Sequence, residues 1–334
     1  MTAATGPNAE TLAARSEKPD PAVTPARGLV RAVLRLHQSA LWFWGLFVGL
    51  AVVGLLWAAG PGVNEAWAEY RAGDCAEADY CEIGAAYNRY ELAVSFATAV
   101  LAVAPVMIGA WAGGALIARE LESGTARLAW TQSVTPARWL AAKLAVPAAV
   151  IASGTILVTL LHRLLWGSDE ELRHALGNRD WFQSETFAAN GTVATAYALF
   201  ALALGAVAGL LIRRSLPALA AGLLGTAALA VTLQSNRHLL WPVETLVSRT
   251  KEPDWTGEMV DRGFISTTGE RVSDIGCTDI SCDRTDVAGY YADFHPSSHF
   301  WPLQLVETGI VLAVTALLVL AAFRLLRRSA GGLG

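Results

Sequence analysis

Residues 119–143 read RELESGTARLAWTQSVTPARWLAAK and form the longest polar interruption between two apolar segments on the cytoplasmic side of the predicted topology. Gly124 readily takes the left-handed conformation that ends a helix. Thr125 can then cap a short new helix. Thr135 followed by Pro136 is a second helix start, with threonine as the cap and proline at the first helical position. The stretch therefore predicts two long helices joined by a short transverse helix, with a sharp break on each side.

The segments on both sides of this stretch indicate a membrane protein. The chain has 334 residues, of which 54% are hydrophobic and only 16% charged, and its mean hydropathy is +0.39. Six mostly apolar stretches are long enough to cross a hydrocarbon core of about 30 Å as helices. Lipid offers no partner to an exposed backbone amide, so helices are expected. The predicted spans are 41–60, 92–118, 139–161, 192–212, 216–233 and 301–323. The expected fold is an all-α polytopic membrane protein with six transmembrane helices.

The distribution of basic residues predicts the orientation. With a cytoplasmic N-terminus, most lysine and arginine residues fall inside, including Arg213 and Arg214 in a tight turn. Most acidic residues then fall outside. The positive-inside rule favours this topology, with both termini cytoplasmic and the chain in a cell membrane. The third extracytoplasmic loop, 234–300, is the largest, and a small folded cap there is plausible.

The four cysteines all fall in extracytoplasmic loops of this topology. Cys75 and Cys81 lie in the first outer loop, and Cys277 and Cys282 lie in the third. Two short-range pairs in an oxidising compartment favour disulfide bonds, although spacing does not fix their connectivity. A zinc site is the alternative.

The N-terminal region divides into two parts. Residues 1–26 are rich in Ala, Pro, Thr and Glu without periodicity and predict a disordered cytoplasmic tail. In 27–40, arginines at four-residue spacing alternate with apolar residues, which is typical of a helix lying in the headgroup layer. The alternative is a simple extension of the first span.

Two pairs of glycines lie four residues apart within predicted spans. Gly109 and Gly113 belong to the second span, and Gly205 and Gly209 to the fourth. Small residues at this spacing let helix backbones approach closely. We therefore expect close helix packing at both pairs.

The central stretch resembles a known family. Residues 119–125, RELESGT, followed by LAWTQSVT at 128–135, are similar to the loop after the second span in permease subunits of type 2 ABC exporters, especially the branch common in actinobacteria. The segment FWPLQ at 300–304 with Glu307 is also similar. Pro136 departs from the pattern, because a basic residue often occupies that position in relatives. The resemblance covers about 25 residues in detail and the six-span arrangement as a whole.

In that family, the loop bears a coupling helix that receives ATP-driven motion from a nucleotide-binding subunit. The resemblance thus implies a coupling loop at 119–138 and a bacterial origin. The implied ATPase-coupling residues are Glu120, Glu122, Gly124, Thr125, Arg127, Leu128, Trp130, Thr131, Gln132 and Arg138. A protruding helix with an aromatic residue and an arginine suits docking into a groove of a partner.

The nucleotide chemistry is expected in a separate subunit. A P-loop needs Gly-Lys-Ser/Thr, yet the lysines are Lys18, Lys143 and Lys251, and none follows glycine. No catalytic residue and no cofactor are therefore assigned to this chain. The expected partners are a cytosolic ABC ATPase that binds ATP and Mg²⁺, a second permease in a homodimer or heterodimer, and the lipid bilayer, with no nucleic acid.

Glu307 lies about two turns into the sixth span. An intramembrane carboxylate is a functional candidate by default. The alternative is structural pairing with Arg237 or Arg163. His295 and His299 could share a helix face as metal ligands, but Pro296 between them and the lack of an adjacent Glu argue against it, so no metal site is assigned.

These observations favour a permease subunit of an ATP-driven exporter, whose cargo leaves no short motif. A second hypothesis is a membrane sensor with a ligand-binding extracytoplasmic loop. A third is an intramembrane enzyme that uses Glu307 with His295 or His299, which would require these groups to converge.

Overall fold

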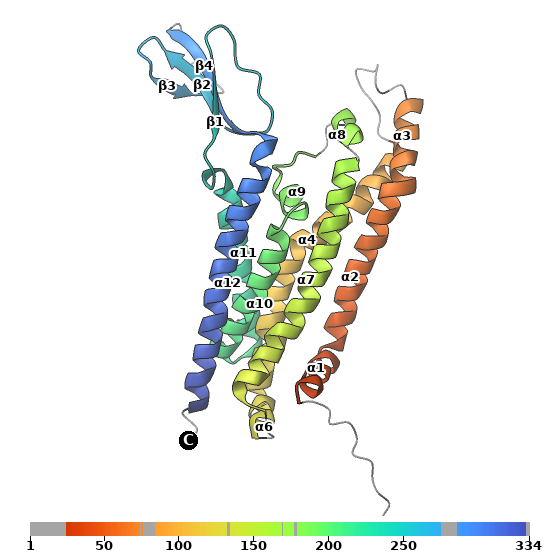
Figure 1. Cartoon of the computed structure of the whole chain (residues 1–334), viewed down its shortest axis with the longest axis vertical. Coiled ribbons are helices and arrows are strands. Elements are labelled where there is room, and N and C mark those ends of the chain that lie inside the picture. The colour runs from red at the N-terminus through yellow and green to blue at the C-terminus, as the bar shows by residue number, and fades with distance from the viewer. Residues whose placement is uncertain are drawn as a thin grey trace, which may run out of the picture.

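The computed structural model describes residues 25–73, 75, 84–131, 134–168, 170–176, 179–274 and 286–331. Within these residues, six helices are long and apolar enough to cross a membrane, and each contains one of the predicted spans or nearly all of it. The all-α polytopic fold is therefore confirmed. The helices run side by side along the long axis of the molecule, with a small sheet at one end and α1, α6 and the C-terminal end of α12 at the other (Figure 1).

The first half of the chain forms α1 (Pro25–Leu36), α2 (Gln38–Trp57), η1 (Ala58–Gly62), α3 (Val63–Ala72), α4 (Ala85–Trp111), η2 (Ala112–Ala118), α5 (Arg119–Glu122), α6 (Thr125–Thr131) and α7 (Pro136–Ser168). The second half forms the helices α8 (Glu170–Leu176), α9 (Ser184–Ala189), α10 (Val193–Ile212), α11 (Ser215–Ser235), η3 (Arg237–Leu239), η5 (Ser297–His299) and α12 (Phe300–Gly331).

Helix α10 is the centre of the bundle. It contacts α4, η2, α7, α11 and α12. In its most apolar 18-residue stretch, 67% is buried inside the bundle, a larger share than in any of the other five spans. Its sequence, VATAYALFALALGAVAGLLI, is dominated by alanine, leucine and glycine. Because small side chains let neighbouring helices approach from several directions, this composition suits the central position.

The glycine pairs pack as expected. A Cβ atom at Gly109 would lie 2.6 Å from the carbonyl oxygen of Gly222 in α11. At Gly205 it would lie 2.6 Å from Cβ of Ala112, and at Gly209 it would lie 2.8 Å from Cβ of Ile117. These distances leave no room for a side chain. The prediction of close helix packing at both pairs is confirmed.

Replacing Gly109 with valine is expected to lower the free energy of unfolding by about 1–3 kcal/mol, the usual cost of overpacking. The reason is that α4 and α11 would have to separate. Gly49→Val is the matched control, since a Cβ atom at Gly49 meets nothing within 4 Å. Unfolding in a mixed-micelle denaturant titration measures both variants. Equal losses in the two would show that the close approach contributes nothing.

The helix of the first predicted span continues beyond it. The predicted span ends at residue 60, but the helix continues through η1 and α3 to Ala72. Pro61 lies inside the π-helical turn η1, where the wider turn accommodates a residue that cannot donate a backbone hydrogen bond. Ala66 is buried, and Val63 and Trp67 pack against the same cluster, which includes residues of α4. The apolar spacing from Val63 to Trp67 is the signal that could have revealed this helix.

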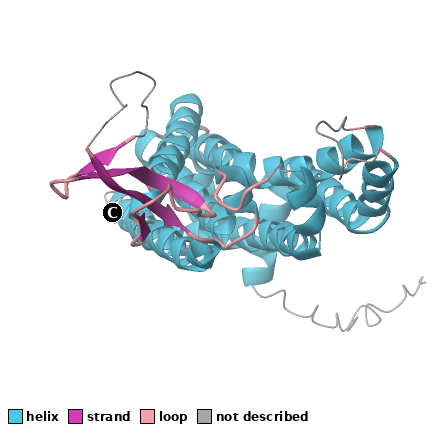
Figure 2. Ribbon diagram, turned by 90° about the horizontal axis from the view of Figure 1, so that it is seen from above, coloured by secondary structure: helices cyan, strands magenta, loops and turns pink. Residues whose placement is uncertain are grey.

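A four-stranded antiparallel sheet lies at one end of the bundle (Figure 1). Its strands are β1 (Glu244–Ser248), β2 (Glu258–Ser266), β3 (Arg271–Ser273) and β4 (Val287–His295), in the order β1-β4-β2-β3. Viewed from above, the strands gather over one side of the bundle (Figure 2). Gly269, with φ +84°, turns the chain between β2 and β3. The sequence predicted a folded cap in this loop but not its strands.

Helix α1 is a separate element and not a straight extension of α2. His37 interrupts the helix with φ −109° and ψ 21°. Val33 and His37 are buried, and α1 packs against α7. Arg31 and Arg35 are exposed. The segment is therefore a helix, while its place in the headgroup layer stays a prediction. Residues 1–24 of the predicted tail lie outside the described residues, and residues 25–26 belong to α1.

The disulfide prediction falls mostly on residues outside the described ranges. Cys75 is described, but Cys81, Cys277 and Cys282 are not. The pairing of the four cysteines therefore stays a prediction.

Candidate functional site

The central stretch has the predicted order of helices and breaks. α4, η2 and α5 follow one another as a continuous helix that ends after Glu122, and Gly124 adopts φ +75°. α7 begins at Pro136, and the Thr135 hydroxyl accepts a hydrogen bond from the Arg138 N–H at 3.4 Å. These breaks confirm the sequence-based prediction. Thr125 begins α6, and its hydroxyl donates to the Glu120 carbonyl at 3.3 Å. Gln132 lies outside the described residues.

Glu120 anchors this loop to the bundle. Its carboxylate forms an ion pair with Lys143 of α7, which is only 3% exposed, and accepts a hydrogen bond from Trp139 Nε1 at 3.2 Å. Lys143 Nζ also lies 3.0 Å from His37 Nε2. A buried charge is stable only when it is paired and hydrogen-bonded. Glu120, Lys143 and His37 therefore join α5, α7 and the α1–α2 junction into one polar cluster.

Glu122 links the same loop to a different helix. Its carboxylate Oε2 accepts hydrogen bonds from the backbone N–H of Ser215 at 2.9 Å and from the Ser215 hydroxyl at 2.5 Å. Ser215 is the first residue of α11. A carboxylate at a helix N-terminus satisfies a free N–H group and complements the helix dipole. The turn before it is closed by Arg213 in the left-handed conformation, with φ 54°. Sequence reasoning identified Glu122 but not this contact.

Short helix α6 presents a small exposed surface at the end of the molecule (Figure 1). Leu128 is 60% exposed, and Arg127, Thr131 and Arg138 are also exposed. Trp130 instead turns inward, with its ring 5.7 Å from that of Trp139 in an edge-to-face arrangement. The aromatic residue thus holds α6 against α7, and the outward surface consists of a leucine with basic and hydroxyl side chains. We refer to Arg127, Leu128, Thr131 and Arg138 as the α6 surface.

Glu307 lies in a second polar cluster, at the other end of the spans. It is fully buried, and its carboxylate accepts hydrogen bonds from Arg237 Nε at 2.8 Å and from the Tyr197 hydroxyl at 2.7 Å. The Arg237 guanidinium also lies 3.9 Å from the centroid of the Phe187 ring. The structural pairing with Arg237 is confirmed. Arg163, the other partner considered, lies over the Phe300 ring at 4.8 Å.

The FWPLQ segment at 300–304, just before Glu307, holds α12 against α9 and α10. Phe300 packs on Phe187 with ring centroids 5.4 Å apart. Gln304 is fully buried, its Nε2 donates to the Phe187 carbonyl at 2.5 Å, and its Oε1 accepts from the Val193 N–H at 3.2 Å. The residues that carry the family resemblance here are therefore packing and hydrogen-bonding residues.

The two histidines near this cluster join the sheet to the helices. His295 Nε2 lies 3.1 Å from the carbonyl oxygen of His238, and its Nδ1 lies 3.0 Å from His299 Nδ1. His299 Nε2 is 3.4 Å from Glu244. Across the described residues, no group of three or more His, Cys, Asp or Glu side chains is placed to hold a metal ion. The arrangement is a structural contact between β1, β4 and the chain that enters α12.

Glu258 of β2 adds a pH-dependent contribution to this junction. Burial raises the pKa of Glu258 above its ordinary value of 4.5, and the nearby charges of His295 and Arg237 oppose the shift. Above pH 4.5, the folded state then binds more protons at this carboxyl than the unfolded state does. Stability at this site therefore falls as pH rises through the raised pKa.

Glu258→Gln is expected to remove this pH dependence and to increase the protection of the β2 and β4 amides from hydrogen exchange at neutral pH. Exchange rates of these amides, corrected for intrinsic rates and compared between acid and neutral pH, measure the protection. Glu270→Gln, an exposed carboxyl between β2 and β3, is the control. If Glu258→Gln and the original chain lose protection equally with rising pH, burial of Glu258 has no such effect.

Comparison with known proteins identifies one family. The model of the family described as ABC-2 membrane transporter related matches residues 46–237, more than half of the chain. The matched range includes the loop at 119–138 and ends before the sheet and α12. No curated protein and no solved structure matches the chain.

Proposed function

The chain belongs to the ABC-2 membrane transporter related family and is a multi-pass membrane component of a transporter, and from this premise we propose that it is the permease subunit of an ATP-driven exporter. A separate cytosolic ABC ATPase would bind ATP and Mg²⁺ and drive efflux. The sequence contains no Gly-Lys-Ser/Thr motif, in agreement with this division of labour. The permease would act as a homodimer or heterodimer.

The observation that carries this proposal is the double attachment of the loop at 119–138. Glu120 ties it to α7, and Glu122 ties it to α11. The α6 surface is exposed. A push on α6 would therefore be transmitted to two transmembrane helices through charged hydrogen bonds, which are stronger than neutral ones.

The proposed orientation places α1, α6 and the C-terminal end of α12 in the cytoplasm of a bacterial cell and the sheet outside it. In this orientation, the exposed arginines of α1 and the pair Arg213 and Arg214 lie on the cytoplasmic side, as the positive-inside rule expects. The loops with the cysteines lie on the oxidising side, where the predicted disulfides can form.

Purification of the tagged chain from its native membranes, with an ATPase assay of the proteins that co-purify, tests the proposal. A P-loop ATPase in stoichiometric amount is expected, and it should be lost when the sequence 128–132 is scrambled. Scrambling an exposed segment at the opposite end of the molecule, such as 245–247 of β1, should leave the ATPase bound. Recovery of the chain alone in both detergent and nanodiscs would contradict the exporter function and favour the sensor hypothesis.

A further inference from the structure

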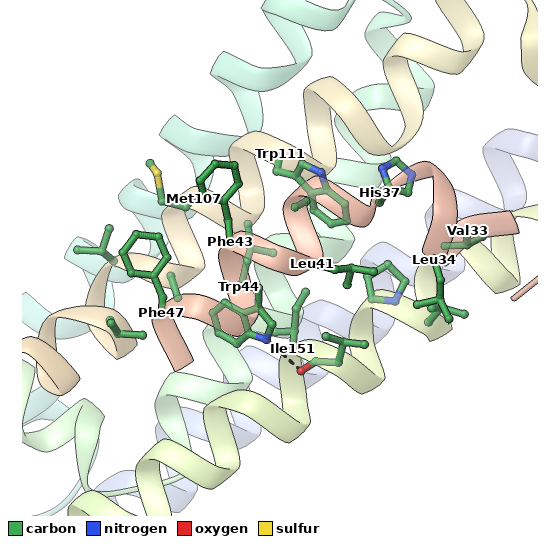
Figure 3. Close-up of a pocket in the computed structure, with 18 of the residues that line it drawn as sticks. Val33, Leu34, His37, Leu41, Phe43, Trp44, Phe47, Met107, Trp111 and Ile151 are labelled. Carbon is green, nitrogen blue, oxygen red and sulfur yellow. Dashed lines mark hydrogen bonds between the residues drawn. The ribbon is translucent and has the colours of Figure 1, made fainter. Parts of the chain in front are cut away.

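A pocket of about 580 Å³ lies between α1, α2, α4 and α7 (Figure 3). This volume is within the range of about 300–1,000 Å³ found for small-molecule sites. Apart from the imidazole of His37, its lining side chains are aliphatic or aromatic, or belong to methionine or proline. The α4 and α7 walls of the pocket lie within the part of the chain that matches the family, whereas the α1 wall and His37 precede it. The residues of the coupling loop do not line the pocket.

The walls of this pocket are fixed by specific contacts. Trp44 Nε1 donates a hydrogen bond to the Val150 carbonyl at 3.2 Å (Figure 3). Its ring fits against Gly154, where a Cβ atom would lie only 2.7 Å away. Phe47 and Phe96 stack with centroids 6.5 Å apart, and His37 meets Trp111 edge to face at 5.3 Å. The space is therefore a formed cavity between held side chains.

The imidazole gives one end of the pocket a polar group. Lys143 Nζ is only a donor, so His37 Nε2 must accept the hydrogen bond between them, and the ring proton lies on Nδ1. Within the described ranges, Nδ1 has no hydrogen-bond partner. The ring can therefore offer an N–H group to an occupant that carries an acceptor.

The rim of the pocket shows from where an occupant would enter. Phe43 is 64% exposed and Met107 is 52% exposed, and both lie on helices that span the membrane. Their exposed faces meet lipid, so an occupant reaches the pocket from the hydrocarbon phase and must be apolar along most of its length. At the His37 end, Arg31 and Arg35 of α1 are exposed, whereas the charge of Lys143 behind the imidazole is paired with Glu120. The two arginines favour an anionic head group.

We propose that this pocket binds the alkyl chain of a single-chain anionic amphiphile, such as a long-chain carboxylate, with its head group at His37, and that occupancy is passed to the coupling loop through Lys143 and Glu120. The second half of this proposal rests on the proposed exporter function. The path is short: the buried groups of His37 and Lys143 are in contact, Lys143 pairs with the partly buried Glu120, and the Glu120 carbonyl accepts from the exposed Thr125 hydroxyl at the start of α6. Because hydrogen-bonded groups in a low-dielectric interior polarise one another, a change at His37 alters the contacts of the others.

Photolabelling tests the binding half with the full chain in nanodiscs. The probe is palmitic acid with a diazirine in its chain, and labelled peptides are mapped by mass spectrometry. Labelling of the α4 and α7 segments that line the pocket is expected, with loss of that labelling on addition of unlabelled palmitate. Hexadecanol and hexadecyltrimethylammonium should compete less well. Equal competition by the cationic amphiphile would overturn the anionic assignment.

Two tryptophan substitutions on α4 provide a matched pair for this measurement. Ala99 lines the pocket and is exposed, so Ala99→Trp fills the entrance without disturbing the core, and the competable labelling should be lost. Ala102 is also exposed on α4 but does not line the pocket, and Ala102→Trp should retain it. Labelling that is not competed, or that survives Ala99→Trp, would mean contact with ordinary bilayer lipid only.

The coupling half has its own measurement. In the purified complex with its ATPase, palmitate should change the ATPase rate, and His37→Phe should abolish this response because phenylalanine keeps a ring but cannot accept from Lys143. Size-exclusion elution of the His37→Phe complex is measured in parallel to show that the variant is folded and still binds the ATPase. An unchanged response in His37→Phe would overturn the path through Lys143. If no ATPase co-purifies, the exporter function fails, while the labelling result still decides whether the pocket binds the amphiphile.

Discussion

Replacing Glu122 with alanine is expected to lower the permease-dependent ATPase rate and ATP-driven transport roughly tenfold or more, a change within the range typical of coupling between separated sites. The chain should still insert and fold, because Glu122 is exposed and contributes to no core cluster. What is lost is the link from the loop to the first turn of α11, where Ser215 donates both its backbone N–H and its hydroxyl.

Two variants control this prediction. Ser215→Ala removes the hydroxyl but keeps the backbone N–H, so a smaller effect than that of Glu122→Ala is expected. Arg119→Ala changes another exposed charge on the same short helix and should have little effect. Co-purification of the ATPase is measured for each variant, because a coupling defect leaves binding intact. A wild-type rate in Glu122→Ala would show that α11 is not driven through this contact.

Loss of one partner of the Glu307–Arg237 pair is expected to have the largest effect on stability. Removing either side of a buried ion pair leaves an uncompensated charge and typically costs about 3–5 kcal/mol. Glu307→Leu leaves Arg237, which is only 3% exposed, without its carboxylate. We therefore expect the free energy of unfolding of Glu307→Leu to fall by an amount in this range, measured by denaturant titration in mixed micelles.

The double variant Glu307→Leu with Arg237→Met provides the control. Replacing both charges by apolar residues of similar size is often neutral or stabilising, so most of the loss should be recovered. Glu307→Gln tests for a role in transport, since it keeps the side-chain shape and one acceptor oxygen, for either Tyr197 or Arg237, but removes the titratable carboxylate. A Glu307→Gln variant that is as stable as the original chain but does not transport would contradict a purely structural pair and indicate a carboxylate in the transport path.

Much of the helical architecture could be predicted from the sequence because its signals are local. A span is recognised by an uninterrupted apolar length, which needs no knowledge of the neighbouring helices. The breaks at Gly124 and Thr135 depend on the conformational preferences of single residues. The spacing of Gly109 and Gly113 predicted close packing of this helix, but it did not identify Gly222 of α11 as the partner.

The parts that sequence reasoning missed depend on contacts between distant segments. Glu122 and Ser215 are 93 positions apart, so no spacing rule relates them. The predicted topology places Lys143 on the cytoplasmic side, at the end of the central stretch, but does not show that it lies buried between Glu120 and His37. Trp130 is oriented inward by its contact with Trp139, which lies in the next helix, α7. The sheet was missed because β1 and β2 both pair with β4, from which long connections separate them in the sequence.

The pairing of Glu307 shows an intermediate case. The sequence identified the carboxylate and named Arg237 among two possible partners, because both arginines lie near the outer ends of other spans. It could not choose between them, since the choice depends on the position of η3 beside α12. Arg163 instead lies against two aromatic rings, those of Phe300 and Trp301.

Site-specific photocrosslinking from α6 tests the central claim that the α6 surface receives an ABC ATPase. A photoreactive benzoylphenylalanine replaces Leu128, which is 60% exposed, and in a control chain it replaces Leu239, which is 70% exposed near the sheet. Irradiation of native membranes should join residue 128, but not residue 239, to a protein that contains a P-loop. A crosslink from residue 239 to the ATPase, or none from residue 128 while the ATPase co-purifies, would contradict this assignment of the docking surface.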